Sequence, residues 1–161
     1  MKPSTATAVQ PGCSEILAHT AFFAELTPQQ LDHVSRLARI EEYPRDSCIY
    51  DLGEHAADIY VLVDGMVRFT IGLGNRQAHA GQILKRGEVF GWAAVVEGAQ
   101  KRIASALCIT SCAVLAINGD QLLILMDQDH GLGYRVMKQL NMLITGNLTA
   151  FASGYVVRRR A

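Results

Sequence analysis

Several features that mark special classes of protein are scarce or missing in this sequence. Its 161 residues include four cysteines without C-x-x-C or zinc-finger spacing, so we expect reduced thiols and neither a disulfide framework nor a zinc site. The 15 basic and 15 acidic side chains cancel, so no overall field draws the chain to nucleic acid or to anionic lipid. Residues 1–12 contain no apolar run of the signal-peptide type, and we expect a cytoplasmic protein.

Long hydrophobic runs are also lacking. The uncharged stretch 103–119 is interrupted by Ser105, Thr110 and Ser111, whereas a membrane span needs about 20 strongly apolar residues. Half of the residues are hydrophobic and the length suits one domain. We therefore expect a single packed globular domain that does not enter a membrane.

The predicted organisation is a flexible arm, one domain and a basic tail. The arm covers residues 1–12, the domain covers 13–152, and the tail covers 153–161 with its run of three arginines. Within the domain, a barrel of strands is predicted over about 41–118 and helices over about 119–152.

A helix is predicted before the barrel. The segment Thr27-Pro28-Gln29-Gln30 has a Thr cap, a Pro in the first turn and a Gln three residues after the cap, which is typical of a helix start. An apolar face follows at helical spacing, so the helix is predicted to end near Arg39 or Ile40. That face consists of Leu31, Val34, Leu37 and Ala38.

Short runs rich in Val, Ile, Tyr, Phe and Thr then alternate with Gly, Asn and Asp as far as residue 117. The runs are predicted to be strands: 59–63 paired with 66–71 across the hairpin turn Asp64-Gly65, 72–75 turning into 77–84, and 103–109 paired with 113–117. Six or more short strands without helices between most of them favour an antiparallel sandwich or barrel.

The helical pattern returns after Asn118, with a short helix predicted around 122–126 and Asp129 capping a longer one that runs to about Ala152. The longer helix has two apolar stripes, so we expect it to pack on its own barrel and also to meet a partner. The alternative is a helix wholly buried in its own domain. We assign the first stripe to a homodimer interface: Leu132, Val136, Leu140, Leu143 and Asn147; the second stripe is Met137, Ile144, Leu148 and Phe151.

The segment 85–104 carries the clearest chemical signal. Gly87 and Gly91 permit tight turns, and the small residues 93–96 can form a helical turn whose free N–H groups favour an anion. Arg102, ten residues after Trp92, has a guanidinium that can complete an anion-binding site. By themselves these residues are better explained by a turn, a helical cap and a surface arginine.

With this segment in place, residues 15–152 resemble the cyclic-nucleotide-binding domain of Crp/Fnr-type sensors. The residues that carry the resemblance are the early strand pattern 50–54 and 58–67, the segment Arg86-Gly87-Glu88-Val89-Phe90-Gly91, and Arg102 followed by Ala104. The resemblance implies an antiparallel double-stranded β-helix (jelly roll) with flanking helices and a cyclic nucleotide, cyclic AMP or cyclic GMP, as possible ligand. The ligand-binding residues it implies are Phe90, Gly91, Trp92, Ala93, Ala94, Arg102, Ile103 and Ala104.

Two residues depart from the family pattern. Family members that bind cyclic AMP carry Glu after the glycine that corresponds to Gly91, and this Glu holds the ribose 2′-hydroxyl. Here that position is Trp92. They carry Ser or Thr after the arginine, but Ile103 stands here. The indole nitrogen of Trp only donates hydrogen bonds and Ile offers no polar contact. Trp92 either stacks on a flat ligand or fills the ribose space and leaves the barrel empty.

Other functions are disfavoured. A metal-dependent barrel enzyme needs three or four converging ligands, but the five histidines are isolated from one another, so we predict no metal site. No G-x-S-x-G motif occurs, and no catalytic residue is predicted. Residues 153–161 are too few for a helix-turn-helix, and Cys13 stands alone near the N-terminus, so direct DNA binding and an iron–sulfur cluster are not expected.

The sequence thus predicts a non-enzymatic sensor domain that binds a cyclic nucleotide or another small anion and signals through its C-terminal helix. It is predicted to form a homodimer and to act on a downstream protein. The alternative is a degenerate domain of the same fold that serves as a protein-interaction module without a ligand.

Overall fold

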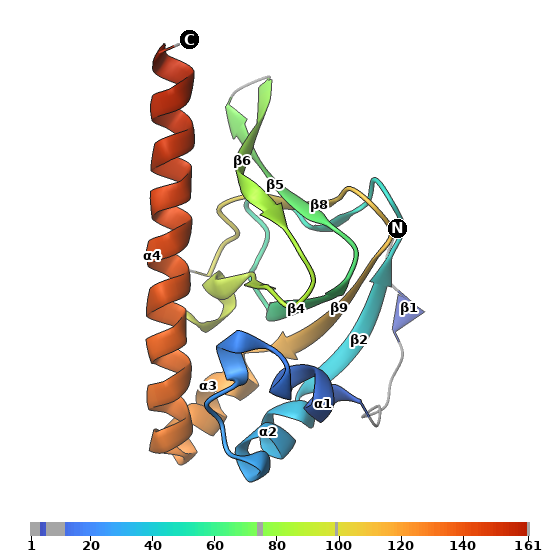
Figure 1. The fold of residues 1–161 in the computed structure, drawn as a ribbon, viewed down its shortest axis with the longest axis vertical. Coiled ribbons are helices and arrows are strands. Elements are labelled where there is room, and N and C mark those ends of the chain that lie inside the picture. Colours follow the sequence, from blue (N-terminus) through green and yellow to red (C-terminus); the bar gives the residue numbers. More distant parts are fainter. Residues whose placement is uncertain (1–3, 6–11, 74–75, 99, 161) are drawn as a thin grey trace.

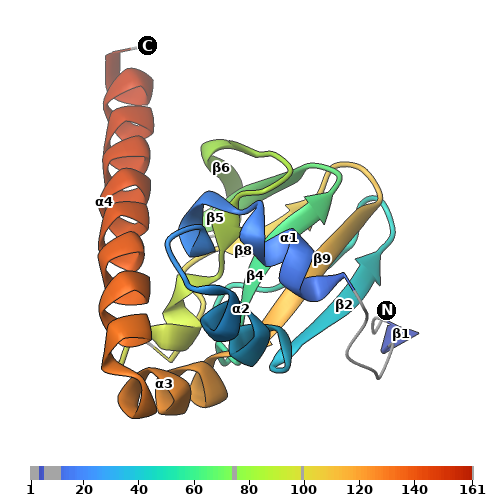
Figure 2. The same ribbon diagram turned by 60° about the horizontal axis from the view of Figure 1, so that its bottom comes forward.

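The computed structural model of the chain describes residues 4–5, 12–73, 76–98 and 100–160 (Figure 1). Strands form a barrel, the N-terminal helices and α3 lie at one end of it, and the long helix α4 stands along one side. Figure 2 shows α3 at the foot of α4, with α2 and α1 in front of the strands. Most of the predicted arm, residues 1–3 and 6–11, lies outside the described residues, whereas β1 (Ser4–Thr5) pairs with β2.

The N-terminal helices are α1 (Cys13–Ala18), the short 3₁₀ helix η1 (Ala21–Phe23) and α2 (Pro28–Ser35). The predicted start of α2 is confirmed by a capping box, in which the Gln30 amide donates to Thr27 Oγ1 at 3.2 Å and the Thr27 amide donates to Gln30 Oε1 at 3.0 Å. The predicted end near Arg39 or Ile40 is wrong. The helix ends at Ser35 because residues from Ala38 onward pair with strand β9 instead.

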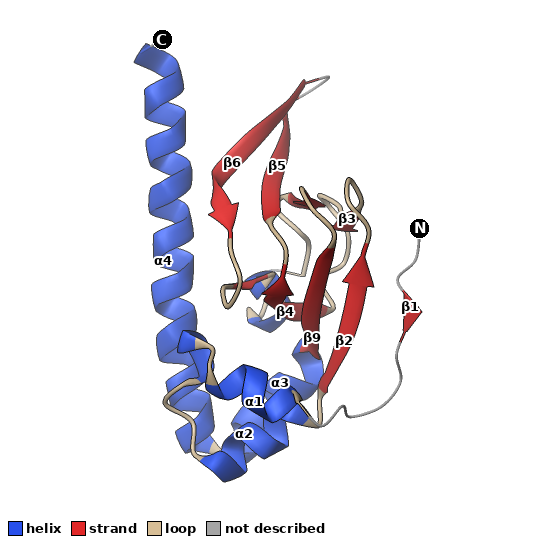
Figure 3. Cartoon of the chain, turned by 45° about the vertical axis from the view of Figure 1, so that its right-hand side comes forward, coloured by secondary structure: helices blue, strands red, loops and turns tan. Residues whose placement is uncertain are grey.

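Two antiparallel sheets make the barrel (Figure 3), and they confirm the predicted jelly roll. One sheet has the order β1-β2-β9-β4-β7 and the other has the order β3-β8-β5-β6. The barrel begins at Ala38 rather than at residue 41. The strands are β2 (Ala38–Tyr43), β3 (Cys48–Tyr50), β4 (Asp58–Asp64), β5 (Val67–Leu73), β6 (Arg76–Leu84), β7 (Val89–Phe90), β8 (Ser105–Cys108) and β9 (Cys112–Asn118).

The two strand pairs predicted across residues 64–65 and 110–112 are wrong. Strands β4 and β5 belong to different sheets, as do β8 and β9, so both connections carry the chain from one sheet to the other. The two connections hold each other: the Ile109 amide donates to Met66 O at 2.9 Å, and the Met66 amide donates to Thr110 Oγ1 at 3.0 Å. The hairpin of this region is β5–β6, paired from Val67 and Leu84 to Leu73 and Arg76.

The C-terminal helices are α3 (Gly119–Gln128) and α4 (His130–Arg160), and their predicted starts are confirmed. Asn118 Oδ1 accepts from the Gln121 amide at 3.0 Å, and Asp129 Oδ1 accepts from the Leu132 amide at 3.0 Å. Helix α4 runs on beyond the predicted end near Ala152. Among the described residues, no helix is long and apolar enough to cross a membrane.

Part of the stripe assigned to a homodimer is buried in the chain's own core. Leu132, Val136 and Leu140 are at most 1% exposed and pack with the N-terminal helices and with strands β4 and β9. They therefore cannot form a surface for a second copy, and the prediction for these three residues is wrong. A second core, between the two sheets, contains aromatic side chains such as Tyr50, Tyr60 and Phe90.

The crossing of the two connections predicts a large cost for replacing Gly65. Its φ is +96°, and an added Cβ would lie 2.5 Å from Ser111 O and 2.7 Å from Cys112 Sγ. Gly65→Ala should lower the free energy of unfolding by about 2 to 4 kcal/mol, because backbone strain and overpacking add. Urea unfolding measures this loss.

Gly53→Ala is the matched control, because Gly53 has φ +84° and no atom within 4 Å of an added Cβ. It should cost about 1 kcal/mol, from the backbone alone. Equal losses for the two variants would contradict the close contact between the connections.

Candidate functional site

Residues 87–104 (the cassette) comprise strand β7 and the connection from β7 to the start of β8. After Gly91, the short 3₁₀ helix η2 (Trp92–Val95) begins. Gly91 has φ +78°, and an added Cβ would lie 2.9 Å from Tyr60 Cδ2 and 3.1 Å from Arg102 Nη1. A glycine is therefore required both by the backbone conformation and by the approach of the arginine.

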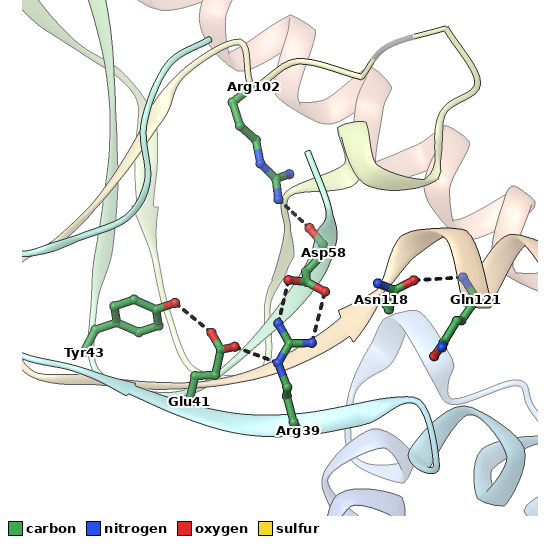
Figure 4. Close-up of polar contacts among 7 residues, drawn as sticks. All are labelled: Arg39, Glu41, Tyr43, Asp58, Arg102, Asn118 and Gln121. Atoms are coloured by element: carbon green, nitrogen blue, oxygen red, sulfur yellow. Dashed lines mark hydrogen bonds and ion pairs between the residues drawn. The ribbon is translucent and has the colours of Figure 1, made fainter. Parts of the chain in front are cut away.

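Arg102 is directed into the molecule and is 4% exposed. Its Nη1 donates to Gly91 O at 2.9 Å and its Nη2 donates to Asp58 O at 2.6 Å (Figure 4). The guanidinium carbon lies 4.1 Å from the centroid of the Tyr50 ring and 5.6 Å from that of Tyr60. The cation is thus held by two main-chain carbonyls and an aromatic face, a contact worth about 2 kcal/mol when desolvated.

One donor of this buried cation has no partner. The Nε of Arg102 makes no hydrogen bond, although it is inaccessible to solvent. Burial raises the pKa of Tyr60 to about 12 and also raises the pKa of Tyr50, so both phenols stay neutral and neither supplies an anion. A buried donor of a charged group without an acceptor is costly, which makes this position suited to an added acceptor.

The cassette and α4 border a cavity of about 30 Å³. It is lined by six of the eight predicted ligand-binding residues and by three others: Gly91, Trp92, Ala93, Arg102, Ile103 and Ala104, with Tyr50, Phe69 and Asn147. A space of this size holds about one water molecule, whereas ligand pockets have about 300 to 1,000 Å³. In this conformation the site is therefore too small for a nucleotide.

Two predicted ligand-binding residues do not line the cavity. Phe90 is 1% exposed and stacks on Tyr60 with ring centroids 5.2 Å apart, so it belongs to the barrel core. Ala94 packs against α3, because a Cβ at Gly119 would overlap its carbonyl oxygen. Sequence analysis missed Tyr50 and Phe69, whose aromatic character in strands is indistinguishable from that of ordinary core residues.

A network of charged residues lies behind the arginine (Figure 4). Arg39 donates to both carboxylate oxygens of Asp58, at 3.1 and 2.7 Å, and to Glu41 Oε1 at 2.8 Å. The Tyr43 hydroxyl donates to Glu41 Oε2 at 2.7 Å. Asp58 joins the network to the site, because its main-chain oxygen accepts from Arg102.

The pKa shifts in this network agree with its geometry. The hydrogen bonds to Asp58 raise the pKa of Arg39, and burial followed by the bond to Glu41 raises the pKa of Tyr43. Sequence analysis missed these residues because it placed residue 39 at a helix end. The period-2 spacing of Arg39, Glu41 and Tyr43, which puts the three side chains on one face of a strand, was the available signal.

Two close contacts connect the cassette to α4. The Ala94 carbonyl lies against Gly119 at the start of α3, and a Cβ at Gly133 of α4 would lie 2.8 Å from Met126 O of α3. Contacts this tight allow little independent displacement of the cassette, α3 and the start of α4. Asn147, farther along α4, lines the cavity itself.

The outer face of α4 carries exposed apolar side chains. Tyr134 is 71% exposed, Met137 is 49% exposed and Leu148 is 57% exposed. With Asn141 and the half-buried Ile144 they recur at intervals of three and four residues, the spacing of a coiled-coil seam. The side chain of Phe151, predicted for the same stripe, lies outside the described residues. No three His, Cys, Asp or Glu side chains of the described part of the chain are placed to hold a metal ion.

Comparisons with known proteins agree with this geometry. The family model described as cyclic nucleotide-binding domain matches residues 40–129. The chain matches no curated protein sequence at a significant level.

Solved structures share the fold at low sequence identity. A cyclic nucleotide-binding domain from Methylobacillus flagellatus KT is 17% identical, with a TM-score of 0.76 over 91% of this chain and 82% of that one. The sensor domain of the transcriptional regulator DNR from Pseudomonas aeruginosa is 16% identical, with a TM-score of 0.68 over 80% of this chain and 91% of that one. The regulatory domain of Toxoplasma gondii PKA, crystallised with cAMP, is 16% identical, with a TM-score of 0.67 over 85% of this chain and 48% of that one.

The contact between the cassette and α3 predicts that Gly119→Ala is destabilising. The added methyl group would overlap the Ala94 carbonyl and push the cassette away from α3, at a cost of about 1 to 3 kcal/mol. Gly146→Ala is the control in a helix, because nothing lies within 4 Å of its added Cβ, and it should stabilise the protein by up to about 1 kcal/mol. Thermal unfolding that moves in the same direction for both variants would contradict the contact.

Proposed function

Because the chain belongs to the cyclic nucleotide-binding domain family, we propose that it is a non-enzymatic, ligand-sensing regulatory domain. Its ligand is a cyclic nucleotide, cyclic AMP or cyclic GMP, or another small anion that binds Arg102 between the cassette and α4. Binding changes the packing of α4, and a downstream protein responds to that change.

The unpartnered donor of Arg102 is the observation that carries this proposal. The guanidinium is 4% exposed, its Nε has no acceptor, and it borders a cavity lined by the cassette and by Asn147 of α4. A phosphate or carboxylate group would supply the acceptor in a charge-assisted hydrogen bond, at about twice the strength of a neutral one.

Binding requires the site to open. The cavity of about 30 Å³ cannot contain a nucleotide, and the arginine is bound to Gly91 O and Asp58 O. The ligand therefore stabilises a second conformation in which the anion replaces these carbonyls as acceptor. The contacts of Ala94 with Gly119 and of Met126 with Gly133 support transmission of that movement to α4.

The lining affects which nucleotide contacts are available. Trp92 is half-buried at the position of the family's ribose-binding Glu, and Ile103, 49% exposed, stands where a hydroxyl is usual. Neither side chain accepts a hydrogen bond from a ribose 2′-hydroxyl. Cyclic AMP is bound by the Toxoplasma relative, and it enters here as a candidate ligand with fewer polar contacts.

The outer stripe of α4 supports a homodimer. Heptad spacing relates the residues of this stripe, which are Tyr134, Met137, Asn141, Ile144 and Leu148. An Asn in the core of such a seam favours two parallel helices in register. We assign the dimer to this stripe in place of the buried residues Leu132, Val136 and Leu140.

A second candidate function is a protein-interaction module without a ligand. The small volume of the cavity favours it, because Trp92 and Phe69 contribute to filling the space that a ligand would need. The two functions differ in one measurable property, the response of the protein to added nucleotides.

Restoring the missing hydroxyl should increase affinity for cyclic nucleotides. Ile103→Thr places a donor and acceptor beside Arg102 at an exposed position, so calorimetric titration with cyclic AMP and cyclic GMP should show binding about tenfold tighter than in the wild type. Ile103→Val has nearly the same shape without the hydroxyl and should leave the affinity unchanged.

Arg102→Ala tests the arginine in the same titrations and should abolish binding. Far-UV circular dichroism checks that this variant is folded, and the Ile103→Thr effect tests the site independently of its stability. Absence of binding by both the wild type and Ile103→Thr would overturn the sensor and favour the interaction module.

The dimer predicts a position-specific effect of charge on α4. Met137→Glu places a carboxylate in the seam and should convert the dimer to a monomer in sedimentation equilibrium. Met142→Glu is the matched control, since Met142 is 64% exposed but lies off the seam, and it should leave the dimer intact. A monomeric wild type, or equal effects of both changes, would contradict this assignment.

A further inference from the structure

We propose that Arg39 is a positioning residue that keeps the carboxylate of Asp58 away from Arg102 and so leaves the charge of Arg102 for the ligand. This inference rests on the proposed binding of an anion by Arg102. Arg39 does not line the cavity, and it acts entirely through Asp58.

Asp58 has two different contacts, one through its main chain and one through its side chain. Its main-chain oxygen accepts from Arg102 Nη2 at 2.6 Å, while its carboxylate accepts from Arg39 Nη1 and Nη2 at 3.1 and 2.7 Å. Figure 4 shows the carboxylate turned toward Arg39 on the side away from Arg102. A residue in direct contact with the buried cation is therefore acidic, but its acidic group binds another partner.

The Asp58 carboxylate needs a cation wherever it points. Asp58 is 8% exposed, and an unpaired carboxylate in such a position is strongly disfavoured. Glu41, 4% exposed, is a second buried carboxylate, which accepts from Arg39 Nε and from the Tyr43 hydroxyl and cannot neutralise Asp58. Among the described residues, Arg102 is the one Lys or Arg that is buried.

Arg102 has a hydrogen-bond donor available. Its Nε is without a partner, and its Nη2 already contacts Asp58. Without the guanidinium of Arg39, rotation of the Asp58 side chain would bring its carboxylate to Arg102 as an ion pair. A ligand anion would then have to displace a covalently attached competitor.

Binding of cyclic AMP, measured by calorimetry at pH 8, tests this role. Arg39→Met keeps the length of the aliphatic side chain and should weaken binding at least about tenfold. Adding Asp58→Asn removes the competing carboxylate but keeps the main-chain acceptor, so the double variant should bind within about threefold of the wild type. Arg39→Lys keeps one charge and should lie between the wild type and Arg39→Met.

Rescue by a second substitution separates positioning from a merely structural role. Far-UV circular dichroism at the titration temperature completes the separation: if Arg39 only stabilised the barrel, the loss of binding in Arg39→Met would be matched by a loss of folded protein, and that result would overturn the proposal.

A ligand-free measurement distinguishes this inference from the proposed function. Thermal shifts of Asp58→Asn and Arg102→Met are measured alone and together, once in the wild type and once in Arg39→Met. The shifts should add in the wild type, where the two side chains do not meet, and should not add in Arg39→Met, where they pair. Additive shifts in both backgrounds would overturn the role of Arg39, whereas failure of the wild type to bind nucleotides contradicts only the proposed function.

Discussion

The burial of the Arg102 guanidinium is the constraint on which the rest of the site depends. A cation with 4% exposure must be compensated, and the chain does so with two main-chain carbonyls and the ring of Tyr50. Each partner imposes its own condition. The carbonyl of Gly91 requires a left-handed glycine before η2, and the carbonyl of Asp58 requires that the acidic side chain of that residue be neutralised elsewhere. Arg39 of strand β2 meets the second condition, and Glu41, itself bound by Tyr43, accepts from Arg39.

The same compensation leaves the cation incompletely satisfied. Main-chain carbonyls carry no net charge, and the Nε has no acceptor, so an anion that reaches the guanidinium offers a stronger contact than the one it replaces. In the proposed function, a ligand shifts the equilibrium toward a second arrangement in which its anionic group replaces the carbonyls. The close contacts at Gly119 and Gly133 place α3 against the cassette and α4 against α3.

The sequence predicted the helix starts from local capping signals, and it predicted the jelly roll and the cassette through the family resemblance that the turn glycines and the spacing between Gly91 and Arg102 carry. It did not predict which strands share a sheet. Asp64-Gly65 has the composition of a hairpin turn, but its partner is the connection at residues 109–112, and no local pattern distinguishes a hairpin from a crossing between sheets. The predicted end of α2 was wrong for a related reason, because pairing of Ala38 with Ile117 overrides helical spacing. In the site, the direction of the Arg102 side chain was also beyond prediction, because it is set by Asp58, far away in the sequence.

The most direct test of the account follows the Nε–H group of Arg102 by NMR during titration of the wild-type protein with cyclic AMP, with the resonance assigned through its loss in Arg102→Lys. The account predicts a saturable change of this resonance that follows the fraction of ligand bound, because the unpartnered donor gains an anionic acceptor. A resonance that stays unchanged while the protein is saturated with the nucleotide would contradict the central role of Arg102.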